Sequence, residues 1–346
     1  MSNTYYEGNV KMKFDYVIGN PPYQEETDSE STRKPPVYNL FMDEAFKIAG
    51  AVELITPARF LFNAGYTPKI WNEKMLNDMH FKIKYYEPIS ENVFHNTDIK
   101  GGVVVSYRDE SKDYGSIGIF TKYDELNAIL KKVNAKIEAS MEEIISSPLS
   151  FQLTEKMKIE NPKMIDRLRS SAFVNLEEIF FENKPEDNRD YIRMIGLLNG
   201  KRVLRYIRKD YIKDSSGTLD SYTLLLPKAS GMGEFGELMG PSSISKPGMG
   251  YTQTFISVGC FDNEEAVHNT NKYVNSKFCR ALLGVLKITQ DMPAPKWKYV
   301  PLQDFTSSSD IDWSKSIPEI DQQLYRKYGL SEEEIEFIET HVKPME

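Results

Sequence analysis

The sequence predicts an α/β fold in its first third, a partial Rossmann-like sheet, followed by a second domain of the α+β class. Three observations predict this division. Strand and helix patterns alternate up to residue 110, a rigid polar loop directly follows the first strand, and the alternation is lost beyond residue 150. The stretch "GMGEFGELMGPSSISKPGMG" in that later part is rich in glycine, proline and serine, which favours short strands joined by irregular segments.

The alternating part begins with the strand Phe14–Ile18, which leads into the loop "NPPY". A helix is predicted in "VYNLFMDEAFKIAG", with Gly50 as its C-terminal cap, and a strand in "AVELITP", which ends at Pro57. A second helix pattern covers Ile70–Met79, and "FKIKYY" and "GGVVVSY" have the pattern of two further strands. This order of elements describes one half of a doubly wound parallel sheet.

A long connecting helix is predicted over Asp124–Ile145, because apolar residues recur there at helical spacing. The C-terminal "LSEEEIEFIETHV" predicts another helix, in which Ser331 and Glu334 form a capping box. The expected organisation is residues 1–120 for the half-sheet domain, 121–148 for the connecting helix, 149–303 for the α+β domain and 304–346 for a tail with a helix.

The composition is that of a globular protein without a membrane segment. Of the 346 residues, 40% are apolar and 27% charged, and no apolar run is long enough for a membrane helix or a signal peptide. The two cysteines, Cys260 and Cys279, are too few for a disulfide framework, and the four histidines are scattered. We therefore expect a cytoplasmic protein that has no metal centre.

The net charge of −8 is unevenly distributed along the chain. Only residues 151–300 carry more basic than acidic groups, which indicates a possible nucleic-acid contact in that segment. The candidates for DNA binding are Lys201, Arg202, Arg205 and Arg208, together with the basic-aromatic group Lys296, Trp297 and Lys298. Each of these residues has an alternative interpretation, as part of a solvated surface or of the core.

The loop Asn20-Pro21-Pro22-Tyr23 has the residue types of a slot for a planar group with an exocyclic amine. The prolines fix the backbone, so that the Asn20 amide oxygen and the Pro21 carbonyl can each accept one N–H of the amine, while Tyr23 covers the ring. A base held in this way has to be flipped out of its duplex. A simple turn after a strand is the alternative, but the carboxyl end of a parallel strand is where such folds bind ligands.

The segment "KFDYVIGNPPYQ" resembles the catalytic motif of the γ-class DNA adenine-N6 methyltransferases of restriction–modification systems. "AVELITPARFLFNAG" and "ENVFHNTDIKGGVVVSY" are similar to later segments of that family, and the C-terminal region is similar to its DNA-recognition part. The resemblance implies catalytic roles for Asn20, Pro21, Pro22 and Tyr23, and stacking of the flipped adenine on Tyr23 and Phe94. It also implies S-adenosylmethionine as cofactor and double-stranded DNA as partner.

The family holds this cofactor with a glycine-rich turn and an acidic residue upstream of the catalytic loop, and neither pattern precedes Lys11. Gly231–Gly236 matches G-x-G-x-x-G, but the glycines and prolines that follow exclude the helix that such a site needs. We therefore expect no cofactor site in this chain, and a sheet that begins at the family's fourth strand. An upstream segment, a second chain or self-association would complete that sheet.

Two functions from different classes follow from these observations. The first is a DNA adenine-N6 methyltransferase component that is inactive alone. The second is a DNA-binding specificity module without catalysis, favoured by the missing cofactor motifs. A third interpretation keeps the slot and changes the substrate to RNA or a protein glutamine amide.

Overall fold

The computed structural model describes residues 14–25, 35–62, 66–95, 97, 99, 101–164 and 167–345. The chain folds as two compact units, residues 1–127 and 128–346. The predicted connecting helix, α+β domain and tail therefore fall largely within one unit. Their division into separate functional segments stays a prediction.

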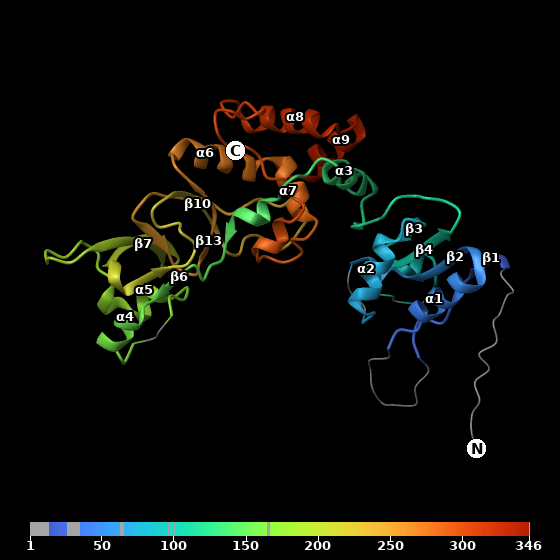
Figure 1. Cartoon of the computed structure of the whole chain (residues 1–346), viewed down its shortest axis with the longest axis horizontal. Helices are drawn as coiled ribbons and strands as arrows, with labels where there is room; N and C mark the ends of the chain where they lie inside the picture. Colours follow the sequence, from blue (N-terminus) through green and yellow to red (C-terminus); the bar gives the residue numbers. More distant parts are fainter. Residues whose placement is uncertain are drawn as a thin grey trace, which may run out of the picture. The chain divides into compact units, whose positions relative to one another are not determined.

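The first unit is built on one four-stranded sheet with the order β1-β2-β4-β3 (Figure 1). The strands are β1 (Phe14–Gly19), β2 (Ala49–Pro57), β3 (Phe81–Glu87) and β4 (Val103–Asp109). β1 and β2 are parallel and joined through helix α1 (Tyr38–Ile48), whereas β4 runs antiparallel to both of its neighbours. Helix α2 (Lys69–Asn77) and two short turns, η1 (Ala58–Phe62) and η2 (Ser90–Asn92), complete the unit's elements before α3.

One face of this sheet carries the core of the unit. Because side chains alternate along a strand, Val52 and Leu54 of β2 point to the same side, where they join Met42 of α1 and Met75 of α2 in one buried cluster. The opposite face is different. Phe14, Tyr16 and Ile18 of β1 are 53%, 45% and 74% exposed, and β1 is the edge strand of the sheet that the described residues form.

Helix α3 (Asp124–Asn134) is much shorter than the predicted Asp124–Ile145, so that prediction was wrong. Residues just beyond the helix pair with a distant segment, since Met141 N–H donates to Val300 O at 2.8 Å and Leu302 N–H to Ala139 O at 2.9 Å. Ser140 then caps a new turn, η3 (Met141–Ile144). A long-range strand-like contact thus replaces the last part of the predicted helix.

The second unit combines three small sheets with short helices. Their orders are β11-β10-β13-β5, β12-β7-β8 and β6-β9. The strands are β5 (Ile145–Ser146), β6 (Phe151–Leu153), β7 (Tyr191–Leu198), β8 (Lys201–Arg208), β9 (Ile212–Asp214), β10 (Tyr222–Pro227), β11 (Ser243–Ser245), β12 (Met249–Tyr251) and β13 (Phe255–Phe261). The α-helices are α4 (Glu155–Glu160), α5 (Ala172–Asn175), α6 (Glu264–Asn275), α7 (Lys277–Gly284), α8 (Ile317–Tyr328) and α9 (Glu332–His341), and the short turns are η4 (Glu177–Ile179), η5 (Lys209–Tyr211) and η6 (Ala294–Trp297).

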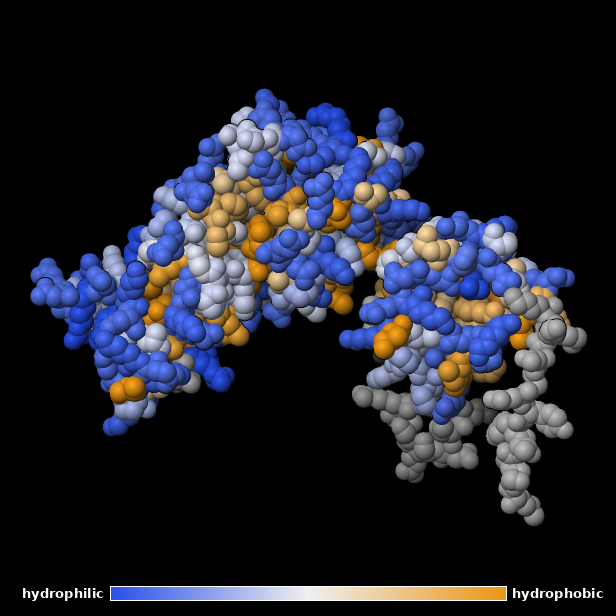
Figure 2. Space-filling model, viewed as in Figure 1, coloured by the Kyte–Doolittle hydropathy of each residue, from blue (hydrophilic) through white to orange (hydrophobic). Residues whose placement is uncertain are grey.

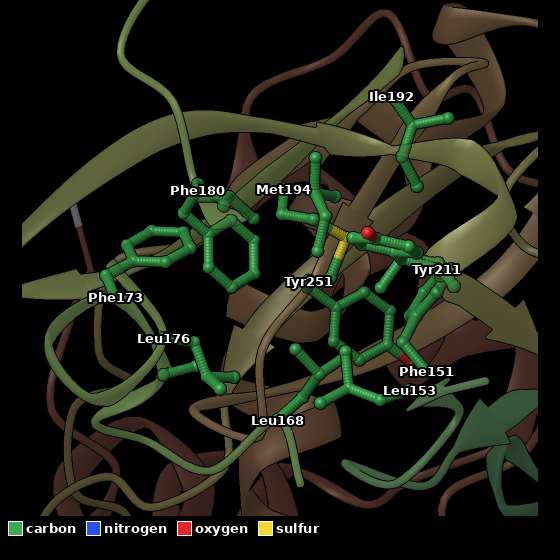
Figure 3. Packing of buried hydrophobic residues seen from close by; sticks show 14 of the residues in the cluster. Phe151, Leu153, Leu168, Phe173, Leu176, Phe180, Ile192, Met194, Tyr211 and Tyr251 are labelled. Atoms are coloured by element: carbon green, nitrogen blue, oxygen red, sulfur yellow. The ribbon is translucent and has the colours of Figure 1, made fainter. Parts of the chain in front are cut away.

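A cluster of large apolar side chains fills the interior between β6, β7, β12 and α5 (Figure 3). Phe151 and Tyr251 meet edge to face with ring centroids 4.9 Å apart, and Phe173 meets Phe180 in the same manner at 4.8 Å. The predicted capping box of the C-terminal helix is confirmed, because Ser331 and Glu334 exchange both of its hydrogen bonds at the start of α9.

Gly50 was predicted to cap the first helix, and this prediction was wrong, because α1 ends at Ile48 and Gly50 already belongs to β2. No helix of the described part of the chain is long and apolar enough to span a membrane. In the view of Figure 2, hydrophilic residues cover most of the surface of each unit and apolar patches interrupt them.

Candidate functional site

The predicted slot, Asn20–Tyr23, lies at the carboxyl end of β1, as the sequence pattern indicates. Gly19 pairs with Leu54, so the loop begins beside the last residues of β2. Its far end is fastened to the segment before α1, because Val37 N–H donates to Tyr23 O at 3.2 Å. Asn20 is exposed and Tyr23 half-buried, so the loop presents its amide to solvent while its ring packs against the core.

The structure brings Phe94 to Tyr23, although the two are far apart in the sequence. Their ring centroids are 6.5 Å apart and the ring planes meet at 65°. Phe94 follows the turn η2, whose Ser90 is buried and accepts a hydrogen bond from Ile99 N–H at 2.8 Å through its hydroxyl. A base stacked on both rings would require the Phe94 ring to turn, since the observed planes are far from parallel.

A glycine closes the segment that carries Phe94. Gly102 has a φ of +77°, and a Cβ placed there would lie 2.2 Å from Glu87 O. Gly102 N–H donates to Ile99 O at 2.9 Å, and Ala58 N–H donates to Gly102 O at 3.0 Å. The close approach of these backbones fixes the base of the loop, and only glycine fits it without displacement.

Several buried polar atoms without hydrogen-bond partners belong to the loop or to the helix and strand that follow it in the chain. Among the described residues they are the Tyr23 and Tyr38 hydroxyls, Asn39 Oδ1 and Thr56 Oγ1. Burial raises the pKa of Tyr23 to about 12, and the nearby Asn20 side chain offsets part of this rise without a well-formed hydrogen bond. Burial likewise raises the pKa of Tyr38 to about 12. Both tyrosines are therefore neutral rings at physiological pH.

Tyr38, Asn39 and Thr56 were not singled out from the sequence. Tyr38 and Asn39 open α1, the helix that directly follows the loop, and Thr56 lies next to the last residue of β2. The rule that points to "NPPY", namely that ligands bind beyond the carboxyl ends of parallel strands, applies to Thr56 as well. Such unsatisfied groups are rare in native interiors, and they mark this end of the sheet as functionally unusual.

Of the predicted basic residues, Arg202 and Arg208 are held by the fold itself. Arg208 is buried between Glu160, 2.7 Å away, and Asp210, also 2.7 Å away, and its guanidinium lies 4.1 Å from the centre of the Tyr211 ring. The guanidinium of Arg202 donates to Pro241 O and, at 3.0 Å, to Ser242 O.

The remaining candidates differ in exposure. Lys201 and Lys298 are exposed, while Arg205 lies 3.6 Å from Glu182. Lys296 is partly exposed, but Trp297 is fully buried and donates its Nε1–H to Met292 O at 3.2 Å. In this structure Trp297 is thus a core residue and presents no open ring for a base.

The glycine loop Gly231–Gly236 encloses a carboxylate of its own chain. Glu237 accepts hydrogen bonds from Met232 N–H at 2.6 Å and Gly233 N–H at 3.0 Å, and it forms a buried ion pair with Lys287. Burial pushes the pKa of Glu237 up, but Lys287 and the two N–H donors outweigh it and hold the pKa below its usual value. The next element is the strand β11, which confirms that no helix opens after the loop.

In the part of the chain that the structure describes, no residues are placed to hold a cofactor or a metal ion. In the described residues, β1 is followed by the proline loop and β2 by Pro57 and η1, so neither parallel strand ends in a glycine-rich turn. These residues do not fit an S-adenosylmethionine site. Across the described part of the chain, no three His, Cys, Asp or Glu side chains are grouped to hold a metal ion.

Comparison with known proteins gives one family match. Residues 2–94, which include the loop and Phe94, match the Eco57I restriction-modification methylase family. Curated protein sequences give no match. Among solved structures, the chain is similar to the type IIL restriction-modification enzyme MmeI in complex with DNA, with 10% identity, a TM-score of 0.35 and coverage of 94% of this chain and 56% of that one. It is also similar to the type IIG restriction endonuclease BpuSI, with 10% identity, a TM-score of 0.33 and coverage of 95% and 54%.

The chain thus spans little more than half the length of these two solved structures. Because the TM-scores of both structures are low, the family match is the comparison that bears on function. In its first 94 residues, the chain is similar to the methylases of restriction–modification systems.

Proposed function

We propose that the first unit supplies the adenine pocket of a site-specific DNA adenine-N6 methyltransferase in a restriction–modification system, and that the second unit binds the DNA. The observation that carries the proposal is the contact between Tyr23 and Phe94 beside the exposed Asn20, inside the segment that matches the methylase family. The Asn20 amide oxygen and the Pro21 carbonyl accept the two N6 hydrogens of a flipped adenine. This pulls the nitrogen toward tetrahedral geometry and frees its lone pair.

Stacking supports the flipped base. A base on Tyr23 gains on the order of 1–3 kcal/mol, which offsets part of the cost of leaving the duplex. Because the pKa of Tyr23 is about 12, the ring stays uncharged over the physiological range. S-adenosylmethionine, by resemblance, supplies the methyl group, and its site lies outside the described residues of this chain.

We propose further that the sheet is completed by an upstream segment, a second chain or self-association. Supporting this, the apolar side chains of β1 are exposed and β1 has a strand partner on one side only in the described structure. A specificity module without catalysis is the alternative, favoured by the lack of a glycine-rich turn in the described part of the sheet.

Asn20→Ala tests the pocket. In the protein supplied with S-adenosylmethionine and whatever chain completes it, we expect methyl transfer to duplex DNA to fall at least a hundredfold, since the amine loses one of its two acceptors. DNA affinity should stay within twofold. Tritiated methyl transfer and fluorescence anisotropy measure the two quantities.

Two variants control this experiment. Asn77→Ala removes another exposed asparagine of the same unit and should leave both quantities unchanged. Tyr23→Phe keeps the stacking ring and removes a hydroxyl that has no partner, so it should retain most activity. Full methylation by the Asn20→Ala protein would refute the pocket, and methylation absent from the wild type would favour the specificity module.

A further inference from the structure

A basic groove opens on the second unit, next to its core cluster. Its volume is about 840 Å³, and we name it the Arg169 groove. The side chains that give it charge and polarity are Gln152, Lys158, Arg167, Arg169 and Gln253. None of these five was among the DNA-binding residues predicted from the sequence.

The groove is built on an apolar floor. Phe151 and Leu153 of β6 and the loop residue Leu168 line it and belong to the buried core cluster, where Figure 3 shows Leu153 and Leu168 close to one another. Leu168 O accepts a hydrogen bond from Gln253 N–H at 3.2 Å. The floor is therefore part of the fold, and it does not depend on a ligand.

The buried floor residue Leu168 determines where its neighbours Arg167 and Arg169 lie. Arg167 and Arg169 flank Leu168 in a tight turn, in which Arg169 N–H donates to Arg167 O at 2.9 Å. Burial of Leu168 leaves both neighbouring side chains exposed. The sequence Arg-Leu-Arg thus fixes two cations at the rim through one apolar anchor.

The charge of the groove contrasts with that of the protein. The whole chain has a net charge of −8, yet no Asp or Glu of the described residues lines the groove. Lys158 lies 2.6 Å from Glu155, whose side chain is 80% exposed and does not line the groove. The Arg169 side chain makes no ion pair with the described residues, so its charge is available to an anion.

We propose that the Arg169 groove binds the backbone of duplex DNA, with Arg167, Arg169 and Lys158 on phosphates and the amides of Gln152 and Gln253 toward base edges. Glutamine can pair with adenine in the major groove, and arginine is suited to phosphate. The groove is lined by basic and by no acidic side chains among the described residues, which suits a polyanion. The proposal rests on the proposed function and moves the DNA contact away from Arg202 and Arg208, which the fold uses internally.

The test compares three full-length proteins by fluorescence anisotropy with a labelled duplex of mixed sequence, over a series of salt concentrations. They are the wild type, Arg167→Gln with Arg169→Gln, and a control, Lys315→Gln with Lys343→Gln, that loses the same charge at exposed positions outside the groove. We expect the slope of log affinity against log salt to fall by about two for the groove variant and to stay unchanged for the control. Arg167→Lys with Arg169→Lys should restore most of the slope, and thermal melts check the folding of all variants.

An unchanged slope in a folded groove variant would overturn the proposal, and so would a wild type that shows no salt-dependent binding. Equal losses in the groove and control variants would also count against it, because they would indicate a general charge effect. Methyl transfer is assayed separately with Asn20→Ala. The adenine pocket can therefore stand or fall independently of the groove.

Discussion

Asp321 lies buried beside the start of α7, although it belongs to α8. Its carboxylate accepts hydrogen bonds from Lys277 N–H at 3.0 Å and Phe278 N–H at 2.9 Å. Burial raises the pKa of Asp321 to about 6, against the lowering effect of these two bonds. A single side chain thus joins two helices and titrates close to neutral pH.

This residue makes the stability of the second unit dependent on pH. Since the pKa of Asp321 is higher in the folded than in the unfolded chain, its contribution is fully present below the unfolded pKa of about 4 and is lost as the pH rises through about 6. We expect its share of the free energy of unfolding to drop by about 3 kcal/mol between pH 4 and pH 7. Urea denaturation across this range measures it.

In Asp321→Asn this fall should disappear, because the amide does not ionise. Asp312→Asn is the matched control. Asp312 is exposed and Ser314 lowers its pKa, so its carboxyl is ionised in the folded and the unfolded chain over nearly all of the range from pH 4 to pH 7, and its removal should leave the fall in stability unchanged. A fall of equal size in wild type and Asp321→Asn would show that another group is responsible.

At the scale of elements, the exposure of β1 does not agree with its apolar sequence. An apolar strand in a parallel sheet is normally covered on both faces, whereas Phe14, Tyr16 and Ile18 are exposed here. Tyr16 finds a partial partner in Glu53, to which its hydroxyl donates, and Lys84 contacts the same carboxylate at 2.9 Å. An edge of this kind invites pairing with another chain.

Ile18→Asp should therefore weaken association. Burial of one isoleucine is worth about 1.5–3 kcal/mol, so the apparent dissociation constant should rise about tenfold or more. Ile70→Asp, at an isoleucine of α2 that is 82% exposed, is the control and should leave association unchanged. Sedimentation velocity gives the constants, and a wild type that stays monomeric at high concentration would contradict the prediction.

Local sequence patterns predicted strands of the first unit. They failed where contacts between distant segments of the chain determine the end of an element. The strands "AVELITP" and "GGVVVSY" are found as β2 and β4, because alternation and β-branched residues are local signals. The helix after Asp124 stops at Asn134, since residues 139–141 pair with residues 300–302, which no local pattern reveals. For the candidate site, "NPPY" is predicted from its residue types, and its role stays a prediction. The interior positions of Arg208 and Trp297 depend on tertiary packing, which the sequence does not reveal.

For the molecule as a whole, the two units each contain a core of their own. Val52 belongs to the cluster of the first unit and Leu225 to that of the second. We expect calorimetry to resolve two unfolding transitions, with Val52→Ala lowering one and Leu225→Ala the other. Truncations of buried side chains cost about 2–5 kcal/mol, enough to shift a transition by several degrees.

A single transition that both variants displace equally would contradict this expectation. The division also suits the proposed function, because methyl transfer and DNA affinity are then properties of separately folded parts. Substitutions in one unit should change one property without abolishing the other.

The carboxylate of Glu237 occupies the glycine loop Gly231–Gly236, so any added anion would have to compete with it for the N–H donors of the loop. Any dissolved phosphate would have to displace an acceptor that is tethered to the same loop, and whose effective concentration is therefore set by the chain itself. Its departure would also leave the buried Lys287 ammonium without its counter-charge. The N–H donors of the loop are already bound to a carboxylate of the same chain. Added nucleotide should therefore leave the structure of the loop unchanged.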